Sequence, residues 1–257
     1  MEKMAISALR SQVAALEHGT ARHRFQESRG ATLPFGIDSI DSHLPGGGLT
    51  LGAVHEIAGG GPEVEHGAAP ALFAASLLAR RPGPVLWIIG KDDLFSDGLA
   101  QAGLDIRRLV LVRARRDALQ AMEEGLRHPD LAGVVCEMEG RLDLVASRRL
   151  QLAAEASDVL GILLRRSRRF NDPALTAPSA ASSRWRISGV PSPPPLAHAP
   201  DVPGISRLHW RLELLRCRGA ESATWNVEGP DAQGRLALAA LLADRSAAPA
   251  PLRRLAG

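Results

Sequence analysis

Apolar residues recur along the chain in short uninterrupted runs, and segments with helical spacing separate these runs. The runs with the length of a strand are 53–57, 85–89, 109–113, 133–137 and 159–165. An apolar run bounded by proline or glycine is typical of a strand buried on both faces of a parallel sheet. The segments with helical spacing are 67–80, 118–127 and 142–156. This alternation predicts a doubly wound α/β fold, a mostly parallel sheet with helices on both faces.

The pattern changes after Arg165. Residues 171–183 and 190–204 are rich in proline, alanine and serine, as exposed loops are. Apolar or alternating segments follow at 184–190, 209–219 and 224–229. We expect them to extend the sheet as antiparallel strands at its C-terminal end, and we expect a short helix over 235–244.

The first residues predict a separate amphipathic helix over 4–17, followed by a polar linker that reaches residue 33. Its apolar side chains recur at helical spacing, and they are Ile6, Leu9, Val13 and Leu16. This helix could dock on a partner or pack on its own domain, and the spacing favours neither. The expected organisation is a helix and linker (1–32), a core (33–230), and a C-terminal helix and tail (231–257).

Composition narrows the class of protein. A chain of 257 residues is long enough for one α/β domain, and a core with five Phe, four Trp and no Tyr must be built mainly from aliphatic side chains. Cys136 and Cys217 are far apart and form no C-x-x-C pair, which suits a reducing cytoplasm and argues against a metal site. No apolar run reaches the roughly 20 residues that a bilayer requires, so we expect no membrane partner.

The stretch EIAGGGPEVEHG, residues 56–67, has the outline of a nucleotide site. A glycine-rich turn between a strand and a helix offers backbone amides to an anion. The candidate nucleotide-binding residues are Gly59, Gly60, Gly61, Gly67 and Ala68. However, a P-loop also needs a lysine followed by serine or threonine, and this stretch has neither, while Glu63 and Glu65 would repel phosphate. We therefore expect a degenerate P-loop that neither hydrolyses ATP nor needs a cofactor.

A basic segment follows the last strand of the predicted parallel sheet. Its candidate contact residues are Arg165, Arg166, Arg168, Arg169 and Phe170. The arginines could contact the phosphates of single-stranded DNA, and the phenylalanine could stack on a base. Since the net charge is only +3, a solvated loop or a contact with an acidic partner remains the alternative.

The order of these pieces resembles the core of RecA-type recombinases and, within that group, the ImuA family. The residues that carry the resemblance are LPFGIDSIDSHLPGGGLTLGAVHEIAG (33–59), QAGLDIRRLVLV (101–112), AGVVCE (132–137) and LHWRLELLRCRGAESATWNVEG (208–229). The resemblance implies a RecA-like fold. It departs from the recombinase pattern where Glu137 takes the place of the magnesium-binding aspartate, and we expect Asp92 and Asp93 to be solvated turn residues.

The resemblance also implies a function. ImuA proteins are accessory proteins of SOS-induced, error-prone translesion DNA synthesis. Their implied partners are ImuB, an inactive relative of lesion-bypass polymerases, and a DnaE-type polymerase, with RecA as a further contact. The alternatives are an ATP-dependent RecA-like DNA-binding protein and a SulA-type inhibitor of cell division.

Overall fold

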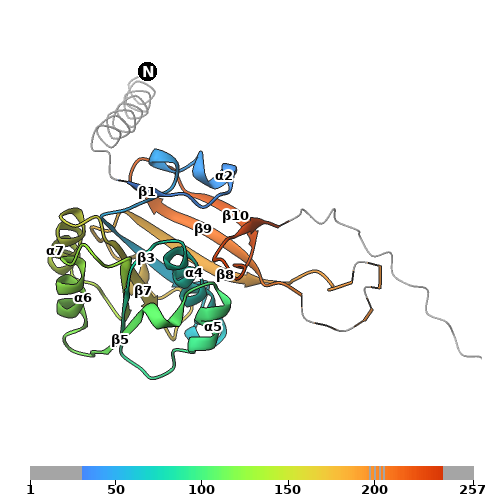
Figure 1. Ribbon diagram of the computed structural model, residues 1–257, viewed down its shortest axis with the longest axis horizontal. Coiled ribbons are helices and arrows are strands. Elements are labelled where there is room, and N and C mark those ends of the chain that lie inside the picture. Colours follow the sequence, from blue (N-terminus) through green and yellow to red (C-terminus); the bar gives the residue numbers. More distant parts are fainter. Residues whose placement is uncertain (1–30, 197, 200, 203, 205, 240–257) are drawn as a thin grey trace, which may run out of the picture.

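A nine-stranded mixed sheet runs through the part of the chain that the computed structural model describes, which is 31–239 without residues 197, 200, 203 and 205 (Figure 1). Its order is β11-β10-β9-β8-β3-β7-β6-β4-β5. The parallel strands are β3 (Ala53–Gly59), β4 (Val85–Ile89), β5 (Leu109–Arg113), β6 (Gly133–Glu139), β7 (Leu160–Arg166) and β8 (Ser183–Val190). Antiparallel pairing adds β9 (His209–Cys217), β10 (Ala223–Glu228) and β11 (Ala237–Leu238). The predicted fold class is confirmed, including the antiparallel strands at the C-terminal end.

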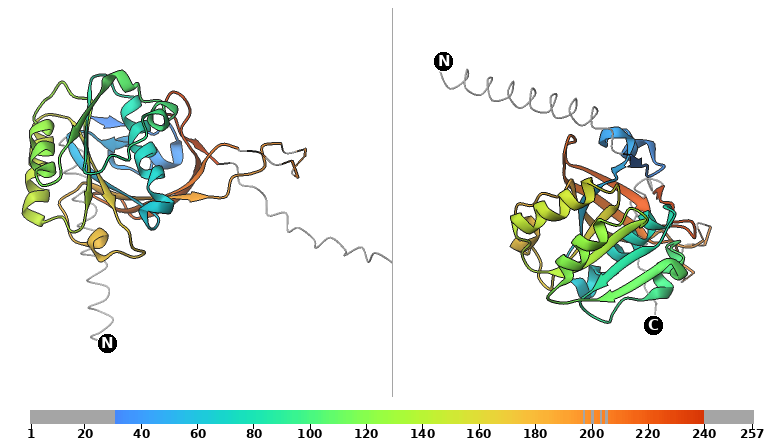
Figure 2. Two further views of the ribbon diagram at one scale, coloured as in Figure 1. Left: turned by 90° about the horizontal axis from the view of Figure 1, so that it is seen from below. Right: turned by 60° about the vertical axis from the view of Figure 1, so that its left-hand side comes forward.

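Helices cover both faces of the parallel part (Figure 2). One face carries α4 (Ala68–Ala79) and α5 (Ser96–Gln101), and the other carries α6 (Ala118–Leu126) and α7 (Leu144–Glu155). Pro70 lies in the first turn of α4, where a missing amide removes no helical hydrogen bond. None of the helices in the described ranges has the length and apolar content needed to cross a bilayer.

A small unit precedes the sheet. It comprises β1 (Thr32–Leu33), α2 (Asp38–Asp41), the 3₁₀ turn η1 (Pro45–Gly47) and β2 (Leu49–Thr50), and β1 pairs with β2. The expected linker therefore ends before Thr32. Phe35 from this unit packs on Phe73 and Trp185, with ring centroids 6.1 and 5.6 Å apart, which fixes the unit to the face that carries α4.

Three expectations from the sequence were wrong. Ala237–Leu238 forms strand β11 against β10, not part of a helix. The segment 171–183 is not a wholly exposed loop: it contains helix α8 (Pro173–Thr176), and Ala181 and Ser182 are buried. Strand β5 is the edge of the sheet, so its outer side is uncovered, and Val110 and Leu111 are about half exposed.

Candidate functional site

The glycine turn lies at the carboxyl end of β3, where open parallel sheets bind ligands. Gly59 ends β3, Gly60 and Gly61 form the turn, and a four-residue helix, α3 (Glu63–His66), follows. Gly67 and Ala68 join α3 to α4. The sequence thus placed the five candidate nucleotide-binding residues correctly with respect to the sheet.

The backbone amides of this turn donate to the protein itself. The Gly60 amide donates to the Ile187 carbonyl at 3.0 Å, and the Glu63 amide donates to the Ser167 carbonyl at 2.7 Å. The amide of Gly67 donates to the Glu63 carbonyl at 2.8 Å. A phosphate cradle needs such amides to be free, so these three are not available to a phosphate.

Close packing accounts for two of the glycines. A Cβ atom on Gly60 would lie 2.0 Å from the Ser188 hydroxyl oxygen. A Cβ atom on Gly61 would lie 2.8 Å from the Phe170 ring and 2.7 Å from the His66 ring. At distances below 3.0 Å the neighbouring side chain must move before a Cβ atom fits, so close packing by itself favours glycine at both positions.

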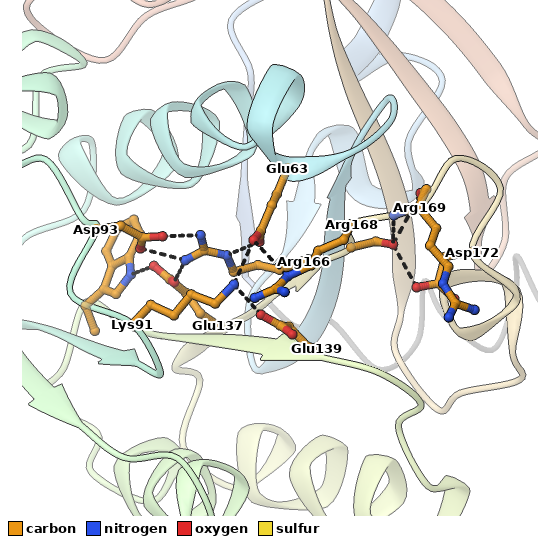
Figure 3. Close-up of polar contacts among 11 residues, drawn as sticks. Glu63, Lys91, Asp93, Glu137, Glu139, Arg166, Arg168, Arg169 and Asp172 are labelled. Atoms are coloured by element: carbon orange, nitrogen blue, oxygen red, sulfur yellow. Dashed lines mark hydrogen bonds and ion pairs between the residues drawn. The ribbon is translucent and has the colours of Figure 1, made fainter.

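An ion-pair network around Arg166 occupies the centre of the site. Figure 3 shows Glu63, Asp93 and Glu137 converging on its guanidinium group from three different segments. The Nε atom donates to Glu63 at 2.8 Å, and Nη1 donates to Glu137 at 2.6 Å and to Asp93 at 2.8 Å. Lys91 extends the network, because its Nζ lies 2.7 Å from Glu63 and 2.5 Å from Glu139.

The network holds its groups in their charged forms. Hydrogen bonding to Asp93, together with bonds to Glu63 and Glu137, raises the pKa of Arg166 despite partial burial. The bond from Arg166 lowers the pKa of Asp93. Burial alone would raise the pKa of Glu63, but the bonds from Lys91 and Arg166 outweigh it, so this pKa is lowered. At neutral pH the site is therefore a set of paired charges.

This arrangement does not fit a magnesium-bound triphosphate. The turn supplies no lysine, and its Glu63 carboxylate would repel phosphate charge. Glu137, at the position of the expected metal-binding acid, accepts from Arg166 and from the Trp87 indole at 2.9 Å. Arg166 thus already pairs with the carboxylates that a metal ion would need.

Asp93 is exposed, as expected, with a side chain 46% exposed, but it is also a member of this network, which the sequence did not predict. Glu63 was noticed in the sequence as an obstacle to phosphate, but its pairing with Arg166 and Lys91 was not predicted. Among the described residues no group of three His, Cys, Asp or Glu side chains is arranged to hold a metal ion.

A cavity of about 360 Å³ lies between the glycine turn, α4 and α5. Its floor is Arg166 with Glu137, and its walls are largely apolar. Val64 and Phe95 line this cavity with side chains that are 92% and 67% exposed. The place of a nucleotide pocket is therefore kept, but its polar part is filled by the protein's own ion pairs.

The basic segment divides into buried and exposed residues. Arg165 was expected to contact phosphate, and this is wrong for the conformation seen here: its side chain is 2% exposed and pairs with Glu56 at 3.0 Å. Arg166 is committed to the network described above. Arg168, Arg169 and Phe170 are exposed, so these three residues can meet a partner or nucleic acid.

A buried network around Glu56 was missed in the sequence. Arg165 and Arg184 donate to its carboxylate, Arg184 at 3.2 Å, and the Ser179 hydroxyl also donates to it. Burial lowers the pKa of Arg165, and Glu56 opposes that shift. Ser179 lies in the segment expected to be an exposed loop, so no local signal identified this contact. The docking residues Ile6, Leu9, Val13 and Leu16 lie outside the described residues.

Comparison with known proteins identifies the family. No protein-family model matches the chain. The RadB recombinase, known from a crystal structure, shares the fold with a TM-score of 0.55 and 16% identity, over 79% of this chain and 98% of RadB. Protein ImuA of Caulobacter vibrioides, in strains NA1000 / CB15N and ATCC 19089 / CIP 103742 / CB 15, is 43% identical over 210 residues, 78% of this chain and 84% of the relative. The RecA-like fold is thereby confirmed, and the chain belongs to the ImuA family.

Proposed function

We propose that this protein is a non-catalytic, RecA-like accessory protein of SOS-induced, error-prone translesion DNA synthesis. Membership in the ImuA family supports the pathway. The observation that carries the non-catalytic part is the Arg166 network, in which Glu63, Asp93 and Glu137 are already paired with one guanidinium group. Electrostatic stabilisation is usually the largest catalytic contribution, and here the charges that would supply it are engaged with one another.

The proposed role is to bring other proteins together. The partners implied by the family are an ImuB-type inactive polymerase relative and a DnaE-type polymerase, with RecA as a further candidate, all in the cytoplasm. Exposed apolar side chains on the described surface support such a role, among them Val64, Phe95 and the edge-strand residues Val110 and Leu111. Val64 and Phe95 line one cavity, and Val110 and Leu111 are adjacent on β5, so these side chains are not scattered singly over the surface.

Nucleotide binding and turnover test the proposal directly. ATP with magnesium is titrated into the full-length protein by calorimetry, and phosphate release is measured on the same sample. We expect neither binding heat nor turnover. Turnover that disappears in a Glu137→Ala variant would overturn the non-catalytic role, whereas turnover that persists in this variant belongs to a contaminating ATPase.

Partner binding provides the second test. The full-length protein is mixed with the ImuB-type and DnaE-type proteins, and complexes are measured by size-exclusion chromatography with light scattering, with and without ATP. We expect a complex whose stability does not change with ATP. Absence of any complex under both conditions, or a strict need for ATP, contradicts the proposal.

Binding to single-stranded DNA is a second candidate function, favoured by the exposure of Arg168, Arg169 and Phe170. The test is fluorescence anisotropy with a labelled oligothymidine at low salt. If the function exists, affinity falls as salt rises, and an Arg168→Ala/Arg169→Ala variant loses it. No binding at low salt eliminates this candidate.

A further inference from the structure

A second cavity, of about 540 Å³, opens at the carboxyl ends of β4, β5 and β6. Lys91 follows β4, Arg115 and Arg116 follow β5, and Met138 belongs to the end of β6. Among the described residues, this cleft shares just Arg166 and Glu137 with the cavity beside the glycine turn. We call it the basic cleft.

The two cations on the inner wall of the basic cleft are already paired with carboxylates. Arg166 pairs with Glu137 at 2.6 Å, and Lys91 pairs with Glu139 at 2.5 Å. Glu139 also raises the pKa of Lys91 through their hydrogen bond, which keeps the ammonium group charged. Arg166 also pairs with Glu63 and Asp93, and Lys91 also pairs with Glu63, so the inner wall has no positive charge left for a ligand.

The outer rim carries unbalanced positive charge. Neither Arg115 nor Arg116 has a carboxylate oxygen within 4.0 Å in the part of the chain that the structure describes. The third rim residue, Arg168, has its nearest such oxygen 3.9 Å away, on Glu63. Arg115 is held in place, because its Nε donates to the Gly90 carbonyl at 3.0 Å. Two guanidinium groups without a carboxylate partner in the described part of the chain, and a third with a distant one, thus border one cavity, where they can pair with an anionic partner.

The remaining lining of the cleft helps to decide between nucleic acid and a peptide as the anionic partner. Ala114, Ala118, Leu119 and Met138 give the cleft an apolar surface, and no aromatic side chain is among the described residues that line it. Single-stranded nucleic acid is usually held by aromatic stacking as well as by charge. A peptide needs pockets for apolar side chains instead, and methionine adapts to them well. The lining therefore favours a peptide.

We propose that the basic cleft docks an acidic segment of a partner protein, in which carboxylate side chains flank an apolar residue. The carboxylates pair with Arg115, Arg116 and Arg168, and the apolar side chain packs on Leu119 and Met138. This inference deepens the proposed role as an interaction protein and rests on it. It requires no nucleotide, since the ion pairs of the inner wall stay intact when the segment binds.

The test uses fluorescence anisotropy with the full-length protein and a fluorescein-labelled peptide, a leucine flanked on both sides by glutamates. Matched probes replace the glutamates with glutamine or with lysine, and a labelled oligothymidine serves as the nucleic-acid probe. We expect saturable binding of the acidic peptide alone, weakening as salt rises. The Arg115→Glu/Arg116→Glu variant should lose about tenfold or more in affinity, because two charge-assisted contacts become repulsive.

A variant with the same change in net charge serves as control. Arg148→Glu/Arg211→Glu alters two exposed arginines on α7 and β9, outside the cleft, and should bind the acidic peptide within about twofold of the unaltered protein. Equal loss in both variants, equal binding of the acidic and glutamine peptides, or binding of oligothymidine without the peptide would overturn the proposal. Phosphate release on the same samples separates the two ideas: turnover contradicts the non-catalytic role and leaves peptide binding standing.

Discussion

Arg166→Gln should destabilise the protein by about 3 kcal/mol, since removing one partner of a buried ion pair leaves uncompensated charge. Its guanidinium group contacts three carboxylates, and the side chain is 20% exposed. Glu137, with a side chain 5% exposed, would keep the Trp87 indole as its donor. The estimate lies at the lower end of the usual 3–5 kcal/mol range, because Asp93 is 46% exposed and Lys91 still neutralises Glu63.

The assay is urea denaturation at neutral pH, monitored by tryptophan fluorescence. Equal m-values of the two proteins show that the same unfolding transition is compared. Arg113→Gln is the matched control, since it removes an ion pair with the neighbouring acid, Asp92, in which both side chains are more than half exposed. Such exposed pairs contribute about 0.5 kcal/mol or less. Equal losses in the two variants would refute the reasoning.

Two further measurements isolate the electrostatic cause. An Arg166→Gln/Glu137→Gln variant should lose less than the sum of the single variants, because it removes the buried charge together with its partner. The folded state lowers the pKa of Asp93 and Glu63. The stability that these pairs contribute is therefore present above the unfolded pKa of about 4 and is lost as pH falls. The difference between wild type and Arg166→Gln should accordingly shrink toward pH 3.

The glycine turn and His55 give two other predictions. Gly60→Ala should lower the free energy of unfolding, measured by urea denaturation, by about 1–3 kcal/mol because its methyl group would overlap Ser188. Gly90→Ala is the control, because its methyl group meets nothing within 4 Å, and its change should stay within about 0.5 kcal/mol. Similar losses in the two variants would show that packing does not explain Gly60. Burial lowers the pKa of His55 to about 4, so the neutral form is favoured in the folded state and stability is lost as pH falls from about 6.5 toward 4. Between pH 7 and pH 5 the wild type should lose about 2 kcal/mol more than His55→Gln, and parallel pH profiles would contradict this.

The site shows why neighbouring residues in a sequence can have unrelated roles. Arg165 and Arg166 are adjacent on β7, and adjacent residues of a strand point to opposite faces of the sheet. Arg165 lies beside Ala58 in the register, on the face of Glu56, whereas Arg166 lies beside Glu139 on the face of Glu137. The basic cluster of the sequence is therefore divided in the structure: Arg165 is buried, Arg166 is the centre of the ion-pair network, and the remaining candidate contact residues are exposed.

Local patterns determined a large part of this protein. The uninterrupted apolar runs specified the strands, because a strand covered on both faces needs apolar side chains on both. The glycine turn was located correctly, and the missing lysine was visible by inspection. The sequence did not show that β5 lies at the edge of the sheet, because the run LVLVR is as apolar as that of a central strand. Strand order depends on how the crossovers pack.

The sequence by itself determined that this is a doubly wound α/β protein whose glycine turn has no P-loop lysine followed by serine or threonine. Only the tertiary structure decided which side chains meet beside that turn. The network joins residues from four segments separated by up to 103 positions, and they are Glu63, Asp93, Glu137 and Arg166. They meet because the carboxyl ends of the parallel strands lie on the same side of the sheet. Ion pairing acts between side chains that are close in space, and no local pattern records which distant segments the strand order brings together.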